Sequence, residues 1–279
     1  MRPHEALLTG IPRSGTTLAC HLLNKVPNTV ALHEPIVFEP MLTRPVPEIC
    51  EAVASFLDST RESILTRGIA WSRHVGGIVP DNHIPEMPEE KGLRRDRALH
   101  GEIRIDAELD PSFTLVVKHI MVFTALLKEL SQRFRCYAMV RNPLHVLASW
   151  NSIDFDFRNG RAPAAEMLDP DLAGRLASAK DRIDRQLVLL DWFCARFVRE
   201  LPAEQILRYE QLIESDGRRL DVVASGAANL NASLAPKPLR NVENREQLQL
   251  LARRLLDYDG AFWDLYSRSS VKNVMDSIC

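Results

Sequence analysis

Residues 10–17 read Gly10-Ile11-Pro12-Arg13-Ser14-Gly15-Thr16-Thr17, between a short apolar run, Ala6-Leu7-Leu8-Thr9, and leucines at helical spacing from Thr17 to Lys25. The two glycines allow the backbone to turn tightly and to approach oxygen atoms. Free backbone N–H groups and the positive end of the following helix dipole can then hold an anion. The stretch therefore predicts a strand, a phosphate-binding loop and a helix, in that order.

One position decides which phosphate compound fits this loop. The glycine spacing is that of the nucleotide-binding loop GxxxxGK[ST], but Thr16 stands where that motif has its lysine. An enzyme acting on a nucleoside triphosphate needs the lysine to reach the β- and γ-phosphates. Here the cation is Arg13, inside the loop, and a guanidinium can bind a phosphate with two hydrogen bonds. We expect one 5′-phosphate to bind, without a triphosphate and magnesium.

Strand-like and helical segments alternate along the chain. After the first apolar run, further strand-like runs lie at residues 29–32, 114–117, 135–140 and 205–209. Helical patterns lie at residues 121–133, from Pro143 onward, and at residues 171–200. This alternation predicts one α/β domain over residues 1–279, with three layers and a central, mostly parallel sheet flanked by helices. Ligands of such sheets bind beyond the carboxyl ends of the strands, where the loop at residues 10–17 is expected.

Two segments fit the alternation poorly. Residues 68–113 are rich in Pro, Gly, His and charged residues, and residues 154–170 mix Phe, Asp, Arg and Pro. Long irregular segments in a compact domain often serve as lids or binding loops. We expect both to be substrate-binding or lid insertions, with plain surface loops as the alternative.

A second cation follows another predicted strand. Arg141-Asn142-Pro143 ends the run at 135–140, and Ser149 lies eight residues after Arg141 on the expected helix. Proline suits the first position of a helix. The arginine fork and the serine hydroxyl can donate hydrogen bonds to one anion.

These residues carry a resemblance to a known family. The stretch from Pro12 to Thr17 resembles the 5′-phosphosulfate loop of the sulfotransferases that use 3′-phosphoadenosine 5′-phosphosulfate (PAPS), and Arg141 with Ser149 resembles their 3′-phosphate motif. The resemblance implies a P-loop NTPase-like sulfotransferase fold, PAPS as co-substrate, adenosine 3′,5′-bisphosphate (PAP) as product, and no metal. It implies that the nucleotide is bound by Pro12, Arg13, Ser14, Gly15, Thr16, Thr17, Arg141, Ser149 and Tyr209.

The resemblance is looser toward the end of the chain. Residues 207–212, Leu-Arg-Tyr-Glu-Gln-Leu, resemble a Tyr-Glu-Asp-Leu stretch of the family, with Gln211 in place of Asp. Tyr209 would then lie near the adenine, or else be an ordinary core tyrosine. The late Arg-Lys-Gly element of the family is not found, although Lys237, Arg240 and Arg245 could complete the 3′-phosphate pocket. Leu18 replaces the adenine-stacking Trp of the cytosolic branch, so the chain is more similar to the bacterial and carbohydrate-type branches.

The candidate catalytic groups follow two strands. His33-Glu34-Pro35 resembles a site where the family places its catalytic base, and we expect Pro35 to keep Glu34 extended. Lys118-His119 resembles the residues that contact the transferring sulfuryl group. Lys118 and Arg13 would hold the phosphosulfate. The sequence leaves Glu34, His33 and His119 as alternatives for the base; solvated or structural side chains are the competing interpretation.

Composition narrows the class of function. The 279 residues carry 35 Lys+Arg against 37 Asp+Glu, a net charge of −2, which favours no nucleic-acid polymer as partner. Five scattered cysteines indicate neither a zinc ribbon nor a disulfide framework. No signal peptide or membrane span is indicated, which predicts a cytoplasmic protein without integral membrane association.

The expected acceptor is a small molecule, carbohydrate, lipid or carrier-bound group. A P-loop small-molecule kinase and a non-catalytic nucleotide-binding module are the alternatives.

Overall fold

The computed structural model describes residues 2, 4–85, 93–237, 239 and 245–277. Its main sheet has five strands, all parallel, in the order β2-β5-β1-β6-β7. The strands are β1 (Glu5–Gly10), β2 (Thr29–His33), β5 (Thr114–Lys118), β6 (Arg135–Val140) and β7 (Ile206–Arg208). The predicted α/β class and parallel sheet are confirmed.

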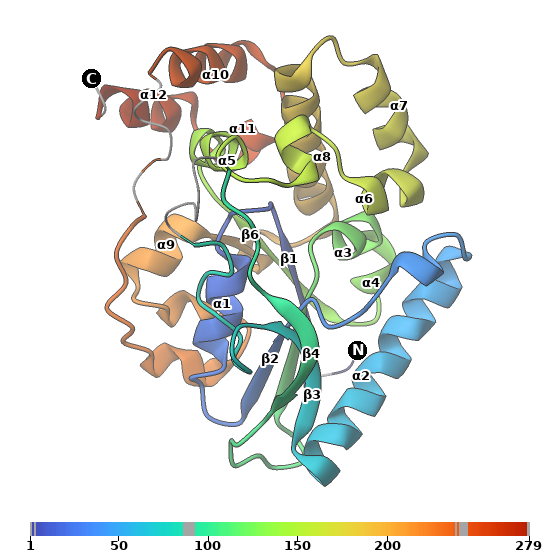
Figure 1. Ribbon diagram of the computed structural model, residues 1–279. Helices are drawn as coiled ribbons and strands as arrows, with labels where there is room; N and C mark the ends of the chain where they lie inside the picture. Colours follow the sequence, from blue (N-terminus) through green and yellow to red (C-terminus); the bar gives the residue numbers. More distant parts are fainter. Residues whose placement is uncertain (1, 3, 86–92, 238, 240–244, 278–279) are drawn as a thin grey trace.

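Helices cover both faces of this sheet, which is why its strands are almost continuously apolar. In Figure 1, α1 (Thr16–Leu23) and α9 (Tyr209–Glu214) lie on one side, and α2 (Val46–Arg67), α3 (Met121–Ala125) and α4 (Leu127–Leu130) lie on the other. The connection from β1 to β2 runs toward one edge of the sheet, and the connection from β5 to β6 runs toward the other edge. Because both connections are right-handed, α1 and α3 lie on opposite faces. The β1 side chains between these layers are buried.

The remaining helices form the upper part of the molecule in Figure 1. There α10 packs against α5 and α8, α11 against α8, and α12 against α5. Their bounds, with those of α6 and α7, are α5 Pro143–Trp150, α6 Pro163–Leu168, α7 Pro170–Ser178, α8 Arg182–Glu200, α10 Arg245–Asp257, α11 Phe262–Leu265 and α12 Arg268–Asp276. Short 3-10 turns lie at Glu39–Met41, Asp156–Asn159, Ala203–Gln205, Arg218–Val222 and Ser225–Asn229. No helix in the described part of the chain is long and apolar enough to span a membrane.

Two sequence predictions about helices are wrong. The helix expected over residues 171–200 is two helices, α7 and α8, because Asp181 leaves the helical conformation and its side chain caps α8 by accepting from the Asp184 N–H at 2.9 Å. The helix expected over 121–133 is likewise interrupted, at Leu126, between α3 and α4.

Residues 68–113 are more regular than predicted. They contain an antiparallel hairpin of β3 (Ile69–His74) and β4 (Leu99–Arg104). Ala70 and Ile103 are paired across this hairpin and buried, while Ser72 accepts a hydrogen bond from the His33 N–H at 3.0 Å. The hairpin is therefore held against the carboxyl end of β2, next to the predicted catalytic residues.

Candidate nucleotide and transfer site

Two glycines fix the shape of the loop between β1 and α1. A Cβ atom on Gly10 would lie 2.5 Å from the Met139 carbonyl oxygen of β6, and one on Gly15 would lie 2.7 Å from a ring carbon of Tyr209. Gly15 also has a φ of 93°, which disfavours a side chain. The loop is thus drawn tightly against β6 and α9. Gly15, Thr16 and Thr17, at the N-terminus of α1, line a pocket, and the first N–H groups of a helix have no partners within it.

Buried neighbours hold the rest of the loop. Trp150 of α5 donates its indole N–H to the Pro12 carbonyl at 2.9 Å, and the Ser14 hydroxyl donates to the Met139 carbonyl at 2.8 Å. Pro12 lines the pocket, whereas Ser14 is fully buried and is not part of the pocket wall. Ser14 therefore fixes the loop on β6, and its hydroxyl is already engaged there.

Arg13 turns its side chain into the pocket. Its φ of 73° is unusual for a residue other than glycine, a strained conformation that proteins keep mostly at functional positions. The Arg13 guanidinium donates to the Ser149 hydroxyl and to the Asn82 side-chain oxygen, both at 3.3 Å. Two predicted nucleotide-binding residues, Arg13 and Ser149, are thereby brought together from positions far apart in the sequence.

Arg141 supplies a second cation to the same pocket. It follows β6 directly, and its guanidinium carbon lies 4.2 Å from the centre of the Tyr209 ring. It donates to the carbonyl oxygens of Arg13 at 3.5 Å and Lys237 at 3.3 Å. Of the three residues expected to complete the 3′-phosphate pocket, Lys237 lines the pocket as well. Arg240 lies outside the described residues, and Arg245 is the first residue of α10 and is not part of the pocket wall.

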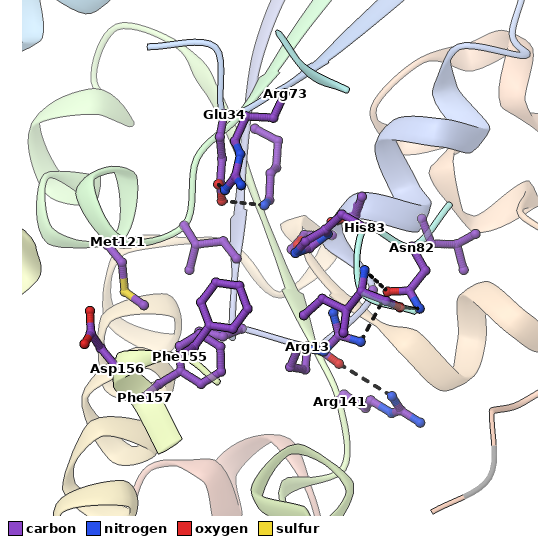
Figure 2. Close-up of a pocket in the computed structure, with 18 of the residues that line it drawn as sticks. Arg13, Glu34, Arg73, Asn82, His83, Met121, Arg141, Phe155, Asp156 and Phe157 are labelled. Carbon is purple, nitrogen blue, oxygen red and sulfur yellow. Dashed lines mark hydrogen bonds and ion pairs between the residues drawn. The ribbon is translucent and has the colours of Figure 1, made fainter. Parts of the chain in front are cut away.

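Glu34 and Lys118 form an ion pair where β2 and β5 end. The Lys118 ammonium donates to the Glu34 carboxylate at 2.6 Å, and Arg73 approaches the other carboxylate oxygen at 3.3 Å. Burial by itself would raise the pKa of the Glu34 carboxyl, but the Lys118 charge beside it brings that pKa well below its usual range. Figure 2 shows Glu34 and Arg73 together at one end of the pocket.

The prediction that Pro35 keeps Glu34 extended is wrong. Glu34 has a φ of 46°, in the left-handed region. This turn lets the Glu34 N–H donate to the Lys118 carbonyl at 2.8 Å while the carboxylate returns to the Lys118 ammonium. The chain thus leaves the strand direction at Glu34, and both its backbone and its side chain are tied to Lys118.

The two predicted histidines lie differently from Glu34. The His33 side chain is buried, and neither of its ring nitrogens has a hydrogen-bond partner among the described residues. Burial and the neighbouring Lys118 lower its pKa. His119 packs edge-on against Phe38, and its Nε2 lies 3.0 Å from the Ile36 carbonyl; burial lowers its pKa to about 4. Neither histidine belongs to the pocket wall as the described residues define it.

Sequence reasoning missed several pocket residues, and three of them, which contact predicted site residues, come from the 68–113 segment. Asn82 orients Arg13, and His83 places its Nδ1 3.2 Å from the Thr17 hydroxyl. Arg73 joins Glu34 to Asp96, with which it also pairs. Burial, with Lys118 and Arg13 nearby, lowers the pKa of His83 to about 3, so its imidazole is neutral. Only the polar composition of the segment pointed toward the pocket.

The phosphate loop, Arg141, the Glu34–Lys118 pair and the three residues of the 68–113 segment line one pocket of about 350 Å³, whereas Ser14, Ser149, His33 and His119 are not part of its wall. Figure 2 shows Arg13, Arg141, Asn82 and His83 on one side, and Met121, Phe155 and Phe157 across from them. The second segment that was predicted to be irregular, 154–170, contains the 3-10 turn at Asp156–Asn159 and α6, and it contributes Phe155, Asp156, Phe157 and residues 162–164 to the wall. Within the described ranges, no three His, Cys, Asp or Glu side chains gather as a metal-binding group.

Comparison with known proteins adds no family to this geometry. No protein-family model matches the chain, and no curated protein matches it significantly.

Proposed function

We propose that this protein is a sulfotransferase that moves the sulfuryl group of PAPS to the hydroxyl of an acceptor. One observation carries the proposal: a single pocket brings together Arg13 of the lysine-free phosphate loop, Arg141 after β6, and the Glu34–Lys118 pair. The parallel sheet with its phosphate loop after the central strand is consistent with the P-loop sulfotransferase fold.

The residues present fit the nucleotide by their chemistry. PAP carries phosphates on both sides of its ribose, and two of the guanidinium groups that line the pocket, those of Arg13 and Arg141, follow the neighbouring strands β1 and β6. Arg13, Thr17 and the N-terminus of α1 would hold the 5′-phosphate, and Arg141 would hold the 3′-phosphate. Ser149, predicted beside Arg141, instead accepts from Arg13 at 3.3 Å and is not part of the pocket wall, so it would orient Arg13. Tyr209, fixed between Gly15 and Arg141, would lie beside the nucleotide. When bound, PAPS supplies an activated sulfuryl group.

Glu34 is the base that this geometry favours. It lines the pocket, whereas His33 and His119 do not. A carboxylate whose pKa is held low by Lys118 is a weak base, so the pair must loosen for proton transfer. We propose that Lys118 turns toward the anionic oxygens of the bound donor, which removes its charge from Glu34 and raises the basicity of the carboxylate.

The proposed transfer is a displacement at the sulfur atom. The acceptor oxygen forms a bond to sulfur while the bond between sulfur and the phosphate oxygen breaks, and Glu34 receives the acceptor's proton. The products are a sulfate ester and PAP. Lys118 and Arg13 would stabilise the negative charge that develops on the leaving phosphate.

Calorimetric titration with PAP, with ATP plus Mg²⁺ as the comparison, tests the proposal. We expect PAP to bind without metal and more tightly than ATP with magnesium. Binding of ATP that requires magnesium, with no response to PAP, would refute the proposal and favour a kinase.

A further inference from the structure

The pocket has an apolar wall that the phosphate-binding groups do not need. Ile120 and Met121, at the start of α3, are half-buried and line the pocket together with Phe155, Phe157 and Ala164. In Figure 2, Met121 and the two phenylalanines lie on the side opposite Arg13 and Arg141, below Glu34 and Arg73. This wall therefore adjoins the transfer site and lies across from the nucleotide end.

The aromatic part of the wall is rigid. The Phe155 and Phe157 rings are stacked, with centroids 5.2 Å apart and an interplanar angle of 10°. Phe157 in turn contacts Trp150, with ring centroids 5.5 Å apart, and Trp150 is the residue that donates to the Pro12 carbonyl of the phosphate loop. Phe157 is buried by these contacts, while Phe155 is half-buried and presents its open side to the pocket. The wall and the phosphate loop therefore keep a fixed relation to each other.

Carboxylates also line the pocket. They include Asp156, which stands between the two phenylalanines in the sequence, and Glu34, Glu39 and Asp81. Figure 2 shows Asp156 beyond Met121 and the phenylalanines, on the outer side of the wall. A wall of this kind offers apolar contact near the reacting groups and repels a negatively charged substituent near its outer side.

We infer that the acceptor is an uncharged alcohol or phenol on an apolar body, which packs against Phe155 and Met121 and presents its hydroxyl to Glu34. The inference rests on the proposed function and names its substrate class. A polyhydroxylated acceptor would leave most of its hydroxyls against apolar side chains, and unpaired polar groups are costly to bury. An apolar body instead gains from removing both surfaces from water.

Two classes of probe test this inference with the full-length protein. The apolar probes are 2-naphthol and 1-octanol, and the polar probe is methyl α-D-glucopyranoside. Binding to the PAP-loaded protein is measured by calorimetry, and PAP release from PAPS is measured for each probe. We expect at least one apolar probe to bind and to be sulfated, and 6-hydroxy-2-naphthoate to bind more weakly than 2-naphthol.

A matched pair of variants locates the binding surface. Phe155→Ala should raise KM for the apolar probe about tenfold, as expected for the loss of roughly 50 Å² of apolar contact, and leave the Kd of PAP unchanged. Phe155→Leu should restore part of this loss. Leu65→Ala removes an exposed apolar side chain of α2, outside the pocket, and should change neither value.

The outcomes separate this inference from the proposed function. Failure of PAP to bind overturns the proposed function and the inference with it. If PAP binds, then acceptance of the glucoside over the apolar probes, or binding of neither apolar probe, overturns the inference alone. A Phe155→Ala protein with unchanged KM for its apolar substrate also overturns it.

Discussion

The buried Glu34–Lys118 ion pair allows a prediction about protein stability that does not depend on the identity of the substrate. The Lys118 side chain is only 1% exposed and that of Glu34 is 21% exposed, and their charged atoms lie 2.6 Å apart. Glu34→Gln leaves the Lys118 charge buried without its carboxylate, a change that costs about 3–5 kcal/mol in fully buried pairs. Because the pocket is open to water on the Glu34 side, we expect about 2–3 kcal/mol here, or a Tm lower by about 5–10 °C.

Lys118→Met should cost less, since Glu34 keeps Arg73 as a partner at 3.3 Å and reaches solvent. The double variant Glu34→Gln/Lys118→Met should be more stable than the sum of the single changes predicts, by about 1–2 kcal/mol, because no unpaired charge is then left buried. Urea unfolding of the four proteins at pH 7 measures this coupling. Additive single effects would refute the reasoning.

The pair Arg2–Asp58 serves as the matched control, because its charged atoms also lie 2.6 Å apart but its side chains are 36% and 61% exposed. Asp58→Asn should cost less than about 1 kcal/mol, as exposed pairs do. The pH dependence gives a second check on Glu34. Its folded pKa is lowered, so its stabilisation is present above pH ~4.5 and is lost as the pH falls through the folded value. If Asp58→Asn were as costly as Glu34→Gln, burial would not be the cause.

Three further predictions concern acid stability, the loop and the second cation. The free energy of unfolding should fall as the pH drops from ~6.5 toward 4. Burial lowers the pKa of four histidines, which therefore stay neutral in the folded protein but take up a proton on unfolding: His33, His83, His119 and His145. His83→Gln should reduce that slope, measured from urea midpoints, by about 1.4 kcal/mol per pH unit, and an unchanged slope would contradict it. Gly15→Ala should destabilise the protein and weaken PAP binding, because the added Cβ would meet the Tyr209 ring. The control Gly76→Ala is also at positive φ (61°) but has open space around it, so it should cost only about 1–2 kcal/mol and leave PAP binding unchanged. Equal effects of the two changes would exclude the Tyr209 contact as the cause. Arg141→Ala should weaken binding of PAP about tenfold or more but not that of adenosine 5′-monophosphate, as calorimetry would show; equal losses for both would rule out a 3′-phosphate role.

The sheet and the phosphate side of the pocket could be predicted because each depends on residues that are contiguous in the sequence. The run Ala6-Leu7-Leu8 before Gly10 already specifies a buried strand, a turn and a helix start, and the structure has them there. Arg141 could be placed for the same reason, at the end of a second buried strand. Parallel strands bring their carboxyl ends to one edge, so Arg13 and Arg141 had to lie near each other.

Other features depend on interactions that no short window contains. Arg73 reaches Glu34 only because a hairpin packs against β2, and His83 reaches Thr17 only because the connection between the two hairpin strands lies against the phosphate loop. The break before α8 is a local signal that was overlooked: Asp181 stands immediately before the helical residues it caps. The left-handed turn at Glu34 is not local, since its partner is the Lys118 backbone on another strand.

The two halves of the pocket are held in one frame. The phosphate loop, the cation after β6 and the carboxylate after β2 belong to the sheet, whose register fixes them relative to one another. The aromatic part of the apolar wall comes from the segment after α5, yet it is tied to the same frame through Trp150, which contacts Phe157 and donates to Pro12. A change at Trp150 should therefore disturb both halves of the pocket. Trp150→Phe, which keeps the ring contact but removes the hydrogen bond, should impair PAP binding more than acceptor binding, and the reverse order would show that the wall is positioned independently of the loop.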